Sequence, residues 1–240
     1  MKIAALTYDF PHPRTAEMLL DMACAGFKPD TLICQPWQTL KLRRSITPTS
    51  PRAQTVAPTP KPKRMCEALG IEYIRAKHAA AGPLALFRGF DLGVVLGARI
   101  IPQDVIEAFK IGILNIHPGL LPFNRGLDAV KWAVHGFTKQ GVTAHLIDGS
   151  VDAGRIVWRE QLDGVRPTDT LIDVAAQVRV LERQTLLLAL TEIGNGNRGQ
   201  SLPQVPSCLH GTMPPAVEAE MLARWPVYVA GYARWKGVDE

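Results

Sequence analysis

The sequence lacks paired cysteines, a long apolar run and a basic N-terminal leader. Its four cysteines are scattered and none belongs to a C-x-x-C pair, so a zinc site or a disulfide framework is not indicated and buried free thiols are expected. No stretch reaches the ~18 uninterrupted apolar residues of a membrane-spanning helix. The first residues do not join a basic region to an apolar core, so we expect no signal peptide, no membrane partner and a cytoplasmic location.

Acidic residues are absent from one segment, and this absence explains the net charge. The 240 residues carry a formal charge of +5. Between Lys41 and Arg64 there are seven basic residues and no acidic ones, and the rest of the chain sums to −2. A protein that coats nucleic acid over its whole surface is therefore excluded. With 47% hydrophobic residues the chain has enough apolar material for a core, which excludes general disorder.

Short apolar runs alternate with amphipathic stretches through the first two-thirds of the sequence, which is typical of an α/β domain. The runs predicted as strands are 2–8, 31–34, 71–75, 91–97 and 113–117, followed by the pair 141–148 and 155–161. The stretches predicted as helices are 15–25, 63–69, 102–109, 128–135, 168–192 and 215–225. We expect a mostly parallel open sheet flanked by helices, Rossmann-like, over residues 1–193, and a short, partly helical C-terminal extension over residues 194–240.

Two segments fall outside this alternation. Residues 35–62 contain six prolines, which predicts a long loop because proline restricts its own φ and disfavours helix before it. This basic loop either contacts the phosphates of an acceptor or is a solvated insertion that binds nothing. The helical stripe at 215–225 is expected to dock on the core, and a homodimer contact is the alternative.

Polar residues interrupt the apolar strand at 113–117. Asn115 and His117 alternate with Leu114 and Ile116, so both project from one face at the end of the strand. Ligands of open α/β sheets bind beyond the carboxyl ends of strands, which makes this pair a candidate site. Asp152 lies in a Val-Asp-Ala-Gly turn between the later strands, and on its own it is an ordinary turn carboxylate.

The runs ILNIHPGLLPFNRGLDAVKWAVHG (113–136) and GVTAHLIDGSVDAGRIV (141–157) resemble the superfamily of N-formyltransferases that use 10-formyltetrahydrofolate. The resemblance is closest to the amino-sugar N-formyltransferases. It implies that Asn115, His117 and Asp152 are catalytic. The Asn115 amide and a protonated His117 would stabilise the negative charge that develops on the formyl oxygen. Asp152 would favour the imidazolium and help relay a proton from the amine. No metal is implied.

The same resemblance implies a folate pocket between two segments. They are Leu96, Gly97, Ala98, Arg99, Ile100 and Ile101 after the central strand, and Asp148, Gly149, Ser150 and Val151 before the aspartate. The acceptor is expected to contact Asn124, Arg125, Asp9 and Arg14. His145, in an otherwise apolar strand, has either a site-lining or a structural role.

The acceptor amine is less well defined by the sequence. We expect a nucleotide-linked aminosugar, a small-molecule substrate. The alternatives are another small amine (an amino acid, a siderophore or an antibiotic precursor) and methionyl-tRNA. The purine enzymes of the superfamily carry a glycine-rich phosphate loop after the first strand, and residues 9–14 contain no glycine. Residues after 190 lack the repeated strand pattern of the C-terminal barrel found in methionyl-tRNA formyltransferases. A non-enzymatic alternative is an inactive folate-binding homologue.

Overall fold

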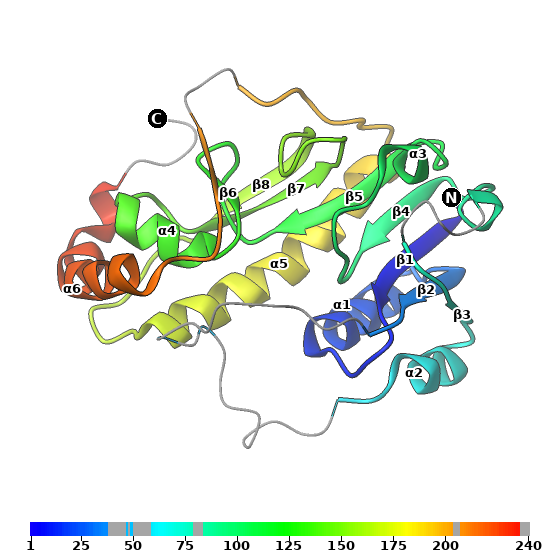
Figure 1. Cartoon of the computed structure of the whole chain (residues 1–240), viewed down its shortest axis with the longest axis horizontal. Helices are drawn as coiled ribbons and strands as arrows, with labels where there is room; N and C mark the ends of the chain where they lie inside the picture. Colours follow the sequence, from blue (N-terminus) through cyan, green and yellow to red (C-terminus); the bar gives the residue numbers. More distant parts are fainter. Residues whose placement is uncertain (38–46, 48, 50–58, 79–83, 204–206, 236–240) are drawn as a thin grey trace.

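The computed structural model describes residues 1–37, 47, 49, 59–78, 84–203 and 207–235. Its central sheet has seven strands in the order β3-β2-β1-β4-β5-β7-β8 (Figure 1). The parallel strands are β1 (Ile3–Tyr8), β2 (Thr31–Gln35), β3 (Glu72–Arg75), β4 (Leu92–Val95) and β5 (Gly112–His117). The strands β7 (Gly141–Leu146) and β8 (Arg155–Gln161) continue the sheet in the antiparallel sense. The prediction of a mostly parallel open sheet flanked by helices is confirmed.

Successive residues of each strand enter different apolar clusters, because side chains alternate between the two faces of a sheet. On one face Leu32, Leu92 and Leu114 join the cluster formed with α1 (Pro13–Cys24), α2 (Pro62–Leu69) and α5 (Leu171–Gly194). On the other face the cluster contains Ile33 and Ile113, together with residues of the short helix α3 (Gln103–Ile106). The inner strands β1, β2 and β4 are therefore buried on both sides, as the continuous apolar run at 91–97 predicts for the middle of a sheet, whereas the edge strand β3 is only partly buried.

The C-terminal extension packs on the domain through its helix α6 (Pro215–Gly231), which contacts α4 (Ala129–Gly136) of the domain. Tyr228 of α6 is fully buried, and its hydroxyl donates to the Thr138 carbonyl 2.7 Å away. The two helices also bury an ion pair, because Lys131 Nζ lies 2.8 Å from Glu218 Oε1 and both side chains are almost inaccessible. Glu218 Oε1 accepts a second hydrogen bond, from the backbone amide of Thr47. The expected docking of this helix on the core is confirmed.

Several element boundaries differ from the sequence predictions. The helix expected at 102–109 is only α3, and it gives way to turns in which Ala108 and Phe109 bond to carbonyls three residues earlier. The long helix α5 begins after Thr170 rather than at Thr168, because Thr170 and Asp173 form a reciprocal capping box. Helix α6 continues past Pro226 to Gly231. Two short strands, β6 (Asn124–Gly126) and β9 (Cys208–His210), were not predicted, and they pair in a separate ribbon.

The remaining described elements are the short 3-10 helices η2 (Leu84–Leu86) and η3 (Tyr232–Arg234). Most of the predicted proline-rich loop, namely 38–46, 48 and 50–58, lies outside the described residues. Within the part of the chain that is described, no helix combines the length and the apolar character needed to cross a membrane.

Replacing Glu218 with alanine is expected to destabilise the fold by about 3–5 kcal/mol, because it leaves the buried Lys131 ammonium without its carboxylate. Urea unfolding followed by circular dichroism measures the change. Glu220→Ala is the matched control on the same helix, since the Glu220 side chain is 62% exposed, and its expected effect is within about 0.5 kcal/mol. Equal decreases in the free energy of unfolding in the two variants would contradict a stabilising role of the ion pair.

Candidate active site at the end of β5

The pairing of β5 with β7 gathers four polar side chains on one face of the sheet. Asn115 lies opposite His145, and His117 lies opposite Thr143. Residues directly opposite each other on paired strands share a face, and on β5 this is the face of Ile113. The apolar cluster with α3 therefore ends at Ile113, and a polar cluster follows it toward the carboxyl end of the strand.

Both ring nitrogens of His117 face protein groups. Nε2 lies 2.6 Å from the Asn124 carbonyl oxygen, and since a carbonyl only accepts, this nitrogen carries the proton. Nδ1 lies 3.4 Å from Asp152 Oδ2. Burial lowers the pKa of His117 below its usual value, against the opposing effects of the Asp152 carboxylate and the Asn124 carbonyl. The lowered pKa favours the neutral form of the ring before reaction, and the expected protonation of His117 during the reaction stays a prediction. The cause of the lowered pKa is burial, since His117 is only 4% exposed.

Asp152 is held as a carboxylate by three neighbours. Oδ2 accepts from the backbone amide of Gly126 at 2.9 Å, and Oδ1 lies 3.5 Å from His145 Nε2. Burial alone would raise the pKa of Asp152, but the contacts with His145, His117 and the Gly126 amide lower it to about 2. The backbone of Asp152 is left-handed, with φ 47°, a conformation that aspartate tolerates better than most residues.

His145 connects the two strands of the cluster to Asp152. Its side chain is fully buried, and Nε2 lies 3.2 Å from Asn115 Nδ2 as well as 3.5 Å from Asp152 Oδ1. Its other ring nitrogen, Nδ1, has no hydrogen-bond partner among the residues that the structure describes. The sequence left the role of His145 open. Its strand position opposite Asn115 is the signal that identifies it as a member of the cluster.

The strand β6 lies against this cluster through its backbone. Asn124 presents its carbonyl to His117, whereas its side chain is buried and donates to Thr138 Oγ1. This placement differs from the predicted contact of the Asn124 side chain with an acceptor. Arg125 Nη2 donates to the Val151 carbonyl at 2.6 Å, so the guanidinium links β6 to the turn that precedes Asp152.

The two predicted folate segments are neighbours. A side-chain carbon on Gly149 would lie 3.0 Å from Oε1 of Gln103, the residue that begins α3 just after segment 96–101. Ile100 is 80% exposed and Val151 is 39% exposed, so each segment presents an apolar side chain. These two adjacent loops expose apolar side chains, and their role in folate binding stays a prediction.

The individual members of these segments differ in their accessibility. Leu96 and Ile101 are buried, and the Leu96 carbonyl accepts from Arg14 Nη1 at 3.1 Å. The hydroxyl of Tyr8 donates to the Ala98 carbonyl, and Ser150 donates its backbone amide to the Asp148 side chain. Gly97, Ala98, Arg99, Asp148 and Ser150 lie in the loops themselves, where the folate role remains a prediction.

Asp9 and Arg14 are both engaged with the protein. Arg14 donates to the carbonyls of Leu96 and Ile116 and pairs with Glu182 Oε1 at 3.0 Å. It therefore joins the ends of β4 and β5 to α5. Asp9 accepts from Tyr73 Oη at 2.7 Å and from Arg75 Nε at 2.6 Å. The structure thus places Asp9 toward β3, away from the His117 cluster at β5.

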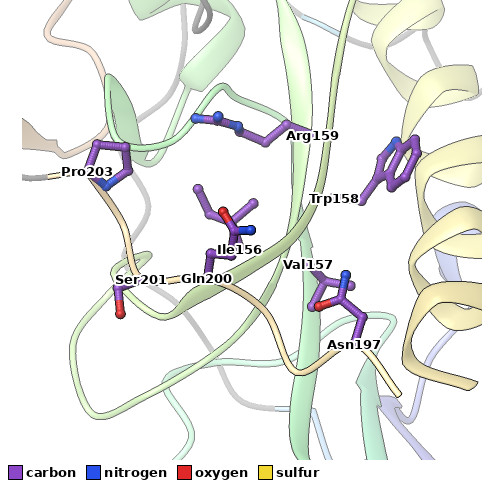
Figure 2. Close-up of a pocket in the computed structure, with 8 residues that line it drawn as sticks. All are labelled: Ile156, Val157, Trp158, Arg159, Asn197, Gln200, Ser201 and Pro203. Carbon is purple, nitrogen blue, oxygen red and sulfur yellow. The ribbon is translucent and has the colours of Figure 1, made fainter. Parts of the chain in front are cut away.

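Among the described residues, no group of three or more His, Cys, Asp or Glu could hold a metal ion. A cavity of about 320 Å³ lies beside the edge strand β8, between residues 156–159 and residues 197–203 (Figure 2). Its lining includes none of the predicted site residues.

The fold and the polar cluster define an α/β domain with a site beyond the carboxyl end of its central strand. The family model described as formyl transferase matches residues 60–190, and the chain belongs to this family. A methionyl-tRNA formyltransferase of Pelotomaculum thermopropionicum is 31% identical over 74% of this chain and 58% of its own length. The chain therefore spans a little over half of that relative.

Solved structures of formyltransferases have a similar fold. The formyltransferase PseJ from Anoxybacillus kamchatkensis, in complex with UDP-4,6-dideoxy-4-formamido-L-AltNAc and tetrahydrofolate, is 25% identical with a TM-score of 0.53 over 64% of this chain and 82% of its own. An N-formyltransferase from Helicobacter canadensis, in complex with folinic acid and dTDP-3-aminofucose, is 17% identical with a TM-score of 0.60 over 88% of this chain and 71% of its own.

The protonation of His117 can be measured directly. NMR titration of 13C-labelled histidine is expected to show a His117 midpoint below that of an exposed histidine. Asp152→Asn is expected to lower this midpoint further, because it removes a carboxylate that raises the pKa. His135→Ala, which removes a histidine on α4, identifies another resonance and should leave His117 unchanged. A midpoint that rises in Asp152→Asn would contradict the electrostatic assignment.

Proposed function

We propose that the protein transfers a formyl group from 10-formyltetrahydrofolate to a primary amine. The observation that carries the proposal is the connected cluster of Asn115, His117, His145 and Asp152 at the end of β5, in a chain of the formyl transferase family. An inactive folate-binding homologue would not need a fully linked amide, imidazole and carboxylate at this position.

The chemistry follows from the groups of the cluster. The donor supplies an activated formyl carbon, to which the nitrogen of a neutral amine forms a bond as the bond to the folate nitrogen breaks. Asn115 donates an N–H to the formyl oxygen, where negative charge develops. His117 is neutral before reaction, takes up at Nδ1 the proton released by the amine, and delivers it to the folate nitrogen as the bond between that nitrogen and the formyl carbon breaks. Asp152, with a pKa of about 2, is ionised and stabilises the imidazolium that results.

The acceptor in this proposal is a nucleotide-linked aminosugar. It is supported by two solved structures of the same fold, whose ligands include a UDP-linked and a dTDP-linked sugar. Arg125, half-buried beside the turn before Asp152, offers a guanidinium near the cluster for a polar or anionic part of the acceptor. The second candidate is methionyl-tRNA, which is favoured by the 31% identity to a methionyl-tRNA formyltransferase.

The domain limits belong to the same proposal. Residues 1–193 form the catalytic part with its two folate segments, and residues 194–240 form an extension that supports it.

His117→Ala and Asp152→Asn are each expected to lower kcat about 10²- to 10⁴-fold, the range of a lost general acid or base. The assay measures formylation of an aminosugar nucleotide or of methionyl-tRNA with 10-formyltetrahydrofolate. Folate binding should be largely retained in both variants, because neither residue lies in the two folate segments. His135→Ala is the control and should keep wild-type activity. Full turnover in His117→Ala or Asp152→Asn would refute the assignment.

Ligand-induced stabilisation distinguishes the two acceptors. Millimolar uridine or thymidine diphosphate is expected to raise the melting temperature, because a ligand at 100 times its Kd stabilises the native state by about 2.7 kcal/mol. Adenosine monophosphate serves as a control for nonspecific binding. No shift with any nucleotide, together with a shift on addition of bulk tRNA, would reject the sugar and support methionyl-tRNA.

A further inference from the structure

A strand from the C-terminal extension lies directly beside the residues that contact His117 and Asp152. β9 pairs with β6 in parallel, with Cys208 opposite Asn124 and His210 opposite Gly126. The pairing continues beyond the strand, since the amide of Leu127 donates to the His210 carbonyl at 2.9 Å. Figure 1 shows the extension crossing from the end of α5 to β6 before it enters α6.

The partner strand β6 is only three residues long, and two of its backbone groups orient the cluster. The carbonyl of Asn124 accepts from His117 Nε2, and the amide of Gly126 donates to Asp152 Oδ2. These two bonds fix the ring tautomer of His117 and one oxygen of Asp152. A strand this short has little stability of its own, so its position depends on the chain that pairs with it.

The contact between the two strands is unusually close at one position. A side-chain carbon on Gly126 would lie 2.0 Å from the His210 carbonyl oxygen, and Gly126 has a φ of +95°. Only glycine allows the strands to approach in this way.

The outer side of β9 is held by α4 and by Asp128, the residue that precedes α4. The His210 ring stacks on Trp132 with centroids 4.3 Å apart, and Trp132 Nε1 donates to the Gly211 carbonyl at 3.1 Å. The amide of Met213 donates to Asp128 Oδ2 at 2.9 Å. β9 is thus fixed between β6 and the beginning of α4.

We propose that β9 is a positioning element of the active site, which acts by holding β6 where the Asn124 carbonyl and the Gly126 amide orient His117 and Asp152. His210 is its main positioning residue, through its ring on Trp132 and its carbonyl against Gly126. This inference rests on the proposed function, because it assigns the C-terminal extension a role in the same reaction. Neither His210 nor Gly126 takes part in the chemistry.

The first test compares two glycines. Gly126→Ala places a methyl group against the His210 carbonyl and is expected to lower kcat at least tenfold, with little change in KM for 10-formyltetrahydrofolate. Gly211→Ala is the matched control one residue after β9, because a side-chain carbon there meets nothing within 4 Å, and it should match the wild type. Unchanged kcat in a folded Gly126→Ala would overturn the inference.

A second pair of variants covers the case in which Gly126→Ala does not fold. His210→Ala removes the ring from Trp132 but leaves the backbone pairing, and a smaller fall in kcat is expected. His210→Phe keeps a ring for stacking and is expected to restore most of the wild-type rate. Equal rates for His210→Ala and the wild type would overturn the role of His210.

A readout independent of catalysis separates this inference from the proposed function. 15N NMR of labelled histidine is expected to show the His117 proton on Nε2 in the wild type and in Gly211→Ala, and a mixture of tautomers in Gly126→Ala. If the wild type transfers no formyl group to any tested amine, the proposed function fails, while the tautomer measurement still decides whether β9 holds the site. A single Nε2 tautomer in Gly126→Ala would contradict the positioning role.

Discussion

The site depends on one constraint, which is that His117 of β5 and His145 of β7 are buried, so their ring nitrogens need hydrogen-bond partners. Alternation along β5 places Asn115 and His117 on the face opposite Leu114, and the antiparallel β7 adds His145. Buried imidazole and amide groups without hydrogen bonds would cost several kcal/mol. The surrounding chain therefore has to supply donors and acceptors at fixed positions.

Two segments supply these partners in different ways. The turn at Asp152 contributes a carboxylate, and its low pKa, about 2, means that the charge is present at neutral pH. The strand β6 contributes only backbone groups, whose geometry does not vary with side-chain rotamers. His117 thus lies between a charged group that favours its protonation and a buried environment that opposes it. Such a balance suits a residue that takes up a proton during a reaction and later releases it.

Much of this arrangement was predictable, and the failures have physical causes. The strands and the pair Asn115–His117 follow from the alternation of apolar and polar residues, which reflects burial directly. The catalytic role of Asp152 was predicted from the family resemblance alone, because a carboxylate before a glycine occurs in many turns. The lowered pKa of His117 could not be predicted from the sequence, since the depth of burial is a property of the packed domain.

Long-range contacts account for the features that the sequence did not predict. β6 and β9 have three residues each and no apolar alternation, so nothing local marks them as strands. Arg14 was expected at the acceptor because its charge is near a strand end. Its guanidinium donates to the carbonyls of Leu96 and Ile116, contacts that only the packed sheet creates.

The parallel pairing of β6 with β9 has a consequence for the order in which the protein folds. Parallel strands need a long connection, and here α4, β7, β8 and α5 all lie between the two. Closing such a loop costs conformational entropy before the contact between the strands stabilises the chain. Strand pairs of this kind are therefore expected to form late. During synthesis the sheet can assemble while residues 208–210 are still within the ribosome. We therefore expect the groups around His117 to take their final positions late in folding.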